Sequence, residues 1–205
     1  MLGDYSQAVA DAASAIQIDD QFTKAFSRRA QAFCKLGKYK EASEDYLVCK
    51  QRNPTDKEVS QLYDTTLEEA HLHGKADSLK AEGNRHISHK EFQRAVDLYT
   101  QSLDCVESAP VLCNRAMAHL KLDQSKEAID DACRALKLDS NFVKAYHRRA
   151  SAYLALKEWQ KARNDFAKIL ELDPSLKKEC QASIDKCDSK LTKEKPPTSE
   201  PRYAD

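Results

Sequence analysis

The sequence predicts an all-α protein assembled from a repeated pair of antiparallel helices. Its composition favours helices, because charged residues make up 32% of the 205 residues while only 4 residues are Gly and 6 are Pro. The chain also repeats itself, since residues 2–54 align with residues 122–174 at a constant offset of 120 and without a gap. A shorter period of 33–34 residues, marked by Ala95, Ala128 and Ala162, is typical of helix–turn–helix units that stack into a solenoid.

The N-terminal half is predicted to be a shortened copy of the C-terminal half. It begins with a single helix at about 4–18, which is followed by one full repeat at about 23–56 and a terminal helix at about 56–73. By the offset of 120, a first repeat and the first helix of a second repeat have no counterpart. The helix at 4–18 therefore has an apolar face without a partner helix, formed by Val9, Ala12, Ala13, Ile16 and Ile18. We expect Met1 to start a fragment, an alternative isoform or an incomplete gene model, and this array to be frayed or completed by another chain.

The C-terminal half is predicted to hold three full repeats, at 76–109, 109–142 and 143–176. A cap helix at about 175–191 follows, because a solenoid needs a polar outer face at its open end. Its predicted buried stripe recurs at three- and four-residue spacing and consists of Leu176, Cys180, Ile184, Cys187 and Leu191. The predicted domains are a truncated array at 1–73, a three-repeat array at 74–191 and a Pro-rich, disordered tail at 192–205.

Composition excludes several classes of partner. A net charge of zero removes the electrostatic basis for binding nucleic acid or an anionic membrane. No apolar run reaches the roughly 20 residues that span a bilayer, and the N-terminus lacks a basic segment followed by an apolar core, so we expect no secretory signal. The seven cysteines are odd in number and include no C-x-x-C pair. We therefore expect core thiols and a cytoplasmic protein.

Five side chains that donate hydrogen bonds fall on the first helices of the three C-terminal repeats. They are Lys80, Asn84, Asn114, Lys144 and Arg148. A spacing of four places two side chains one turn apart on the same face of a helix, so these residues are expected to share one groove. A groove lined by donors alone is suited to an anion, here a peptide carboxylate. Ordinary solvated surface charge is the alternative, but it does not account for two Asn inside helices, where Asn is a poor helix former.

The repeat resembles the tetratricopeptide repeat, whose first helices line the concave face of a right-handed superhelix. The pattern K-x3-N, then N, then K-x3-R resembles the two-carboxylate clamp of tetratricopeptide co-chaperones. That family includes the Hsp organising protein, the tetratricopeptide immunophilins, sperm-associated antigen and the RNA-polymerase-associated assembly factor. The resemblance covers about 75–191 fully and about 2–73 in part.

The resemblance implies a role for each residue of the motif. Lys80, Asn84 and Asn114 would hold the main-chain carboxylate of a ligand's last residue. Lys144 would pair with the side chain of a terminal Asp, and Arg148 with groups just upstream. The implied ligand is the Glu-Glu-Val-Asp terminus of the heat-shock 70 or 90 chaperones, and because both tails end alike the sequence leaves their order of preference open.

The first array keeps a possible remnant of the same clamp in Lys24 and Arg28, the counterparts of Lys144 and Arg148. Counterparts of the other three clamp residues are absent, so we expect this array not to bind a terminal carboxylate, although a longer form could supply them. A second hypothesis for the whole chain is a scaffold whose concave face binds an internal peptide or a helix of a multiprotein assembly.

The sequence gives no support for an enzyme, a metal site or a cofactor. His71, His73, His86 and His89 cluster in sequence, but no third ligand has matching spacing. Cys113 with His119 could suggest a nucleophile and its base, yet no acid or oxyanion element accompanies them. We expect a non-catalytic adaptor.

Overall fold

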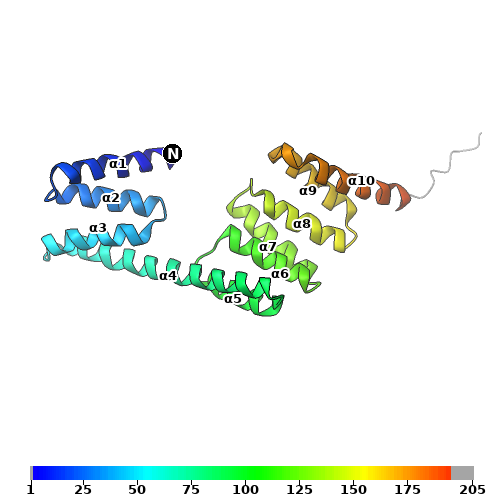
Figure 1. Ribbon diagram of the computed structural model, residues 1–205, viewed down its shortest axis with the longest axis horizontal. Helices are drawn as coiled ribbons and strands as arrows, with labels where there is room; N and C mark the ends of the chain where they lie inside the picture. The colour runs from blue at the N-terminus through cyan, green and yellow to red at the C-terminus, as the bar shows by residue number, and fades with distance from the viewer. Residues whose placement is uncertain (1, 195–205) are drawn as a thin grey trace, which may run out of the picture. The chain divides into compact units, whose positions relative to one another are not determined.

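The computed structural model describes residues 2–194, and within that range it consists of helices and short turns without a strand (Figure 1). The predicted all-α fold is confirmed. The α-helices are α1 (Leu2–Ile18), α2 (Thr23–Lys35), α3 (Tyr39–Arg52), α4 (Lys57–Ser88), α5 (Phe92–Cys105), α6 (Ala109–Lys121), α7 (Ser125–Leu138), α8 (Val143–Ala155), α9 (Trp159–Leu172) and α10 (Lys177–Glu194), with a 3₁₀ turn at Pro174–Leu176.

The chain divides into two compact units, Met1–Asp77 and Ser78–Asp205. In the first, α1 packs on α2 and α2 on α3, and Leu62 and Tyr63 at the start of α4 pack against a core of Ala30, Ala42 and Tyr46. In the second, α5 to α10 stack in chain order, each against the next (Figure 1). The predicted pairing of helices within each repeat is therefore present in both units.

Helix α4 differs from the expectation. The terminal helix expected at about 56–73 and the helix expected from 76 form one uninterrupted helix, Lys57–Ser88. Gly74 does not end it, because a single glycine costs a helix interior only about 1 kcal/mol relative to Ala and no proline follows. The two units thus share α4.

The C-terminal cap helix also extends further than expected. It starts after the 3₁₀ turn and continues to Glu194, so Thr192 belongs to the helix and not to the tail. Cys180, Ile184 and Cys187 are buried against α9, as the predicted stripe requires. The rest of the predicted disordered tail, residues 195–205, lies outside the described residues.

Residues with a left-handed backbone conformation (positive φ) follow the end of the first helix in several pairs. Gly37, Lys90, Asp123 and Lys157 have φ values of 71°, 62°, 58° and 60°. The N–H of the next residue then bonds to a carbonyl five residues back, as from Glu158 to Tyr153 O at 2.8 Å. This is the Schellman pattern, which satisfies carbonyls left over at a helix end. It turns the chain sharply enough for the next helix to run back along the first.

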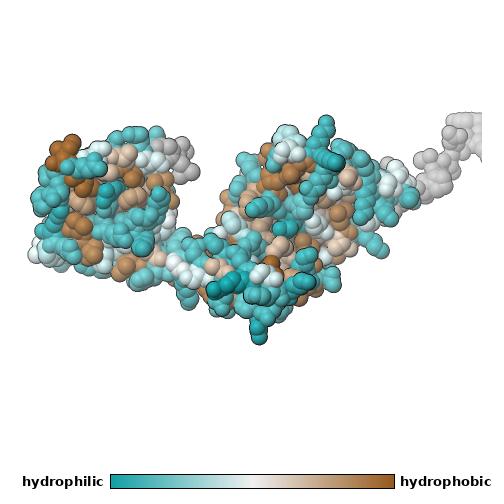
Figure 2. All heavy atoms as spheres, in the orientation of Figure 1, coloured by the Kyte–Doolittle hydropathy of each residue, from teal (hydrophilic) through white to brown (hydrophobic). Residues whose placement is uncertain are grey.

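Small residues let the paired helices approach closely. Ala95, Ala128 and Ala162, which mark the repeat in the sequence, are all 0% exposed. Gly83 in α4 lies directly against the ring of Tyr99 in α5, where an added Cβ would stand 2.7 Å from Tyr99 Cε1. Outside these contacts, hydrophilic residues cover most of the visible face of each unit (Figure 2).

A recurring ion pair, which our sequence analysis missed, joins the two helices of three pairs. An Arg of the first helix donates two hydrogen bonds to an Asp sixteen residues later. The pairs are Arg29 with Asp45 at 2.8 and 2.7 Å, Arg115 with Asp131 at 2.8 and 2.6 Å, and Arg149 with Asp165 at 2.9 and 2.7 Å. All three Asp residues are buried, and the bidentate geometry supplies the partners that a buried carboxylate requires.

Candidate functional site

Two of the predicted site residues lie in direct contact. Asn114 Nδ2 in α6 donates a hydrogen bond to Asn84 Oδ1 in α4 at 3.0 Å. The hydroxyl of Tyr99 in α5 donates to the same oxygen at 2.7 Å. Two donors on Oδ1 orient the Asn84 amide, so that its NH₂ group points the opposite way. Across residues 2–194, no hydrogen bond from Asn84 Nδ2 to the protein is present, which leaves that group available to an acceptor.

Tyr99 holds this arrangement in place. Its side chain is 0% exposed, and burial raises the pKa of its hydroxyl to about 12, partly offset by hydrogen bonding with Asn114. The phenol therefore stays protonated and remains a donor. Sequence analysis recognised Tyr99 only as a repeated aromatic; its role in orienting Asn84 depends on two helices meeting and carries no sequence signal of its own.

The two cationic residues of α8 lie beside α6. Arg148 Nη2 is 3.5 Å from Met117 Sδ. Cys113 of α6 is buried, which raises the pKa of its thiol to about 12, while the nearby charges of Arg148 and Lys144 act in the opposite direction. Both cations therefore lie close to Cys113. Helix α6 thus contacts the Asn84 amide through Asn114 and the Arg148 guanidinium through Met117.

One donor of the site is buried without a partner. Among the side chains that the structure describes, Arg148 Nε is the buried nitrogen or oxygen that makes no hydrogen bond. A buried, unsatisfied donor costs about 1–3 kcal/mol, and more when it is charged. Because this nitrogen is enclosed by the protein, a ligand would meet Arg148 through the rest of its guanidinium.

The remaining predicted residues are placed as follows. Lys80 lies one turn before Asn84 in α4 and is half-buried, while Lys144 is exposed. In the first unit, Lys24 and Arg28 are both exposed on α2. Arg28 lies at the groove between α1 and α2 and has no helix corresponding to α6 beside it within the described residues. The structure therefore assembles donors in the second unit and only an isolated pair in the first.

The histidines and cysteines that could have suggested chemistry have ordinary surroundings. His86 Nδ1 lies 2.5 Å from Glu91 Oε2, and His119 Nδ1 lies 2.7 Å from Gln124 Oε1, both at turns between paired helices. From residue 2 to residue 194, no three His, Cys, Asp or Glu side chains gather in a way that could hold a metal ion. None of the helices described there is long and apolar enough to cross a membrane.

Comparison with known families decides what these helix pairs are. Residues 109–142 and 143–176 each match the tetratricopeptide repeat family, over the same bounds that the sequence periodicity predicts. This chain belongs to the tetratricopeptide-repeat family. The match covers α6 to α9, the helices that carry three of the five predicted site residues.

Curated relatives of this tetratricopeptide-repeat protein are longer proteins. Serine/threonine-protein phosphatase T of Aspergillus oryzae is 45% identical over 78 residues, which are 38% of this chain and 16% of that protein. The chain spans between 16% and 34% of the length of the first curated relatives that it matches.

Solved structures give a closer comparison. The first tetratricopeptide domain of Spaghetti (RPAP3), bound to the HSP90 peptide SRMEEVD, has a TM-score of 0.57 and 30% identity, and the alignment covers 58% of this chain and 95% of that domain. The second domain of human RPAP3, in complex with the HSP70 peptide SGPTIEEVD, has a TM-score of 0.55 and 32% identity over 57% of this chain and 98% of that domain. Both similar domains carry peptides that end in Glu-Val-Asp.

Proposed function

We propose that the second unit of this tetratricopeptide-repeat protein docks the C-terminal Glu-Glu-Val-Asp carboxylates of heat-shock 70 or 90 chaperones in the groove of residues 76–176. The chain would then act as a co-chaperone adaptor. The observation that carries the proposal is the NH₂ group of Asn84, a donor that Tyr99 and Asn114 orient and that has no acceptor among the described residues. The chaperone peptides bound by the two similar RPAP3 domains supply the class of ligand.

The resemblance to the two-carboxylate clamp supplies the role of each residue in this proposal. Lys80, Asn84 and Asn114 hold the main-chain carboxylate of the last residue, and the contact between the two amides supports this grouping. Lys144 pairs with the side chain of the terminal Asp. Arg148 donates to groups just upstream.

The expected affinity is moderate. Hydrogen bonds to charged groups contribute about 1.5–3 kcal/mol each, but ordering a flexible tail offsets much of that sum. We expect a dissociation constant on the order of micromolar, which corresponds to about −8 kcal/mol. Because Asn84 and Lys144 are exposed to solvent, binding should weaken as the ionic strength rises through about 0.15 M. The proposed activity is cytoplasmic.

The test uses the full chain and three peptides. SRMEEVD and SGPTIEEVD are titrated by calorimetry and compared with SRMEEVD amidated at its C-terminus. The proposal requires that amidation, which removes one carboxylate, weakens binding at least about tenfold, equivalent to 1.4 kcal/mol. The ratio of the two free peptides gives the preference between the chaperone classes.

Two double variants, one in each unit, test which unit binds the peptide. Lys144→Ala with Arg148→Ala should abolish measurable binding. The matched control is Lys24→Ala with Arg28→Ala, the same two residue types at the same repeat positions in the first unit, and it should leave binding unchanged. Equal binding of free and amidated peptides would overturn the proposal and favour a scaffold that binds internal peptides.

A further inference from the structure

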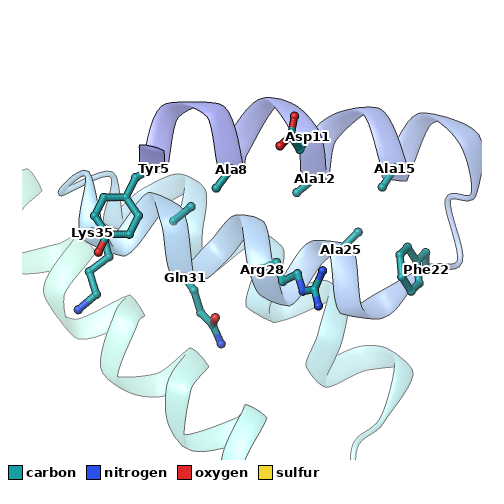
Figure 3. A pocket seen from close by; sticks show the side chains of 11 residues that line it. Tyr5, Ala8, Asp11, Ala12, Ala15, Phe22, Ala25, Arg28, Gln31 and Lys35 are labelled. Carbon is teal, nitrogen blue, oxygen red and sulfur yellow. The ribbon is translucent and has the colours of Figure 1, made fainter. Parts of the chain in front are cut away.

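The first unit contains an apolar groove between α1 and α2 with a volume of about 550 Å³ (Figure 3). Figure 3 shows the small side chains of α1 facing those of α2 across this space. Its lining consists of Tyr5, Ala8, Asp11, Ala12, Ala15, Phe22, Ala25, Arg28, Gln31, Ala32 and Lys35. Ala8 and Phe22 are exposed, so the groove presents apolar surface to solvent.

The second unit shows what covers the same surface. At the offset of 120, eight of the lining residues recur unchanged, as Ala128, Asp131, Ala132, Ala135, Phe142, Ala145, Arg148 and Ala152. There, α6 fills the space between α7 and α8. Ala116 of α6 packs with Ala128 and Ala152, and Leu112 and Cys113 pack with Ala135 and Ala145. Those four alanines are 0% exposed, so the small side chains are fitted to a helix at this distance.

The carboxylate of Asp11 indicates one residue that a helix docked in the groove would carry. In the second unit Asp131 is 4% exposed and accepts two hydrogen bonds from Arg115 of α6. Its counterpart in the groove, Asp11, is exposed and accepts a hydrogen bond from Gln7 Nε2 at 2.8 Å on its own helix. Since an Arg–Asp pair joins the helices of three other pairs, Asp11 stands where an arginine of a helix docked in the groove would bind.

We infer that the groove between α1 and α2 is a docking site for an amphipathic α-helix that carries an arginine followed by alanine. Two apolar residues lie three and two positions before the arginine, as Leu112 and Cys113 do before Arg115 in α6. The helix lies as α6 does on α7 and α8, its alanine against Ala8 and Ala32 and its arginine bonded to Asp11. It also covers Arg28, as α6 covers Arg148 through Met117. This inference is independent of the proposed function.

The test supplies such a helix to the full chain. A copy of residues 108–121 is fused in place of Met1, because Lys121 aligns with Met1 at the offset of 120. Residues 2–4, the first of α1, align with the turn Leu122–Gln124 and would form the turn between the two helices. Hydrogen exchange is measured over α1 with and without the added helix. We expect protection of the α1 amides to rise at least about tenfold, because a helix without a packed face opens locally.

The arginine contact is tested by substitution. Asp11→Asn, or Gln in place of the arginine of the copied segment, should remove most of the added protection. Exchanging the charges, with Asp11→Arg and Asp in place of that arginine, should restore it. Glu44→Gln, an exposed acid on α3 of the same unit, is the matched control and should change nothing.

Three outcomes would overturn the inference. The first is an added helix that leaves the exchange of α1 unchanged, and the second is protection that does not depend on Asp11. The third is self-association of the unmodified chain in analytical ultracentrifugation that Ala15→Arg abolishes, because a second copy would then be the occupant of the groove.

Discussion

Two glycines of α4 should respond in opposite ways to the same substitution. At Gly83 an alanine Cβ would stand 2.7 Å from Tyr99 Cε1 and 2.9 Å from Cδ1, closer than carbon atoms approach in folded proteins. At Gly74 an added Cβ would meet nothing within 4 Å. Both lie inside the same helix with helical backbone. Gly83→Ala and Gly74→Ala therefore separate the effect of packing from that of helix propensity.

The magnitudes follow from these distances. Replacing glycine by alanine inside a helix stabilises it by about 0.5–1 kcal/mol, and we expect Gly74→Ala to show that gain. Gly83→Ala has the same gain but overpacks a filled core, which costs about 1–3 kcal/mol. The ring of Tyr99 cannot retreat, because it is 0% exposed and packed with Val111 and Ala118. The net expectation for Gly83→Ala is a loss of roughly 0–2.5 kcal/mol.

Urea denaturation followed by circular dichroism measures both variants, and hydrogen exchange assigns each change to its unit. A double-mutant cycle with Tyr99→Leu identifies the contact. Once the ring is removed, Gly83→Ala should stabilise the protein as Gly74→Ala does. Equal stabilisation by the two alanines in the unaltered background would show that Tyr99 does not press on Gly83, and the reasoning from close helix packing would be wrong.

Three further predictions concern one ion pair, one turn and one buried thiol. Asp165→Asn should lower the free energy of unfolding by about 2–4 kcal/mol, since it removes a buried partner from Arg149; a loss below 0.5 kcal/mol in urea denaturation would contradict this. Lys157→Gly should raise stability by up to about 1 kcal/mol, because glycine adopts its φ of 60° without strain, and a lower melting temperature would disprove it. Burial raises the pKa of Cys113 from 9.0 to about 12, so the folded state holds its proton where the unfolded state has lost it. Stability should thus fall as the pH rises from about 9 to about 12, and Cys113→Ala should flatten that decline in a pH series of melting temperatures.

The sequence predicted the helix pairs well because their signals are local. The period of 33–34 residues locates the alanines at which paired helices touch, and Ala95, Ala128 and Ala162 are all fully buried. The interruption expected after residue 73 was wrong because a single glycine is a weak signal: Gly74 costs the helix less than the bonds on either side contribute. Whether a helix ends at such a residue thus depends on a free-energy difference too small to be evident in the hydrophobic periodicity of the sequence.

The candidate site was predicted only as a list of residues on matching faces. That Asn84 and Asn114 would touch follows from the distance between α4 and α6, which the size of the side chains between the helices sets. The assignment of Lys80 and Lys144 to a ligand's carboxylates stays a prediction until binding is measured.

Helix periodicity, the duplication at an offset of 120 and the type of each donor were determined by the sequence alone, because each depends on residues near one another in the chain or on their chemistry. The tertiary structure decided which groups meet across helices. Tyr99 orients Asn84, Arg148 Nε is buried without a partner, and the groove beside Asp11 is open. These features arise from packing between segments 15 or more residues apart, and side-chain volume and desolvation, not local periodicity, determine their energies.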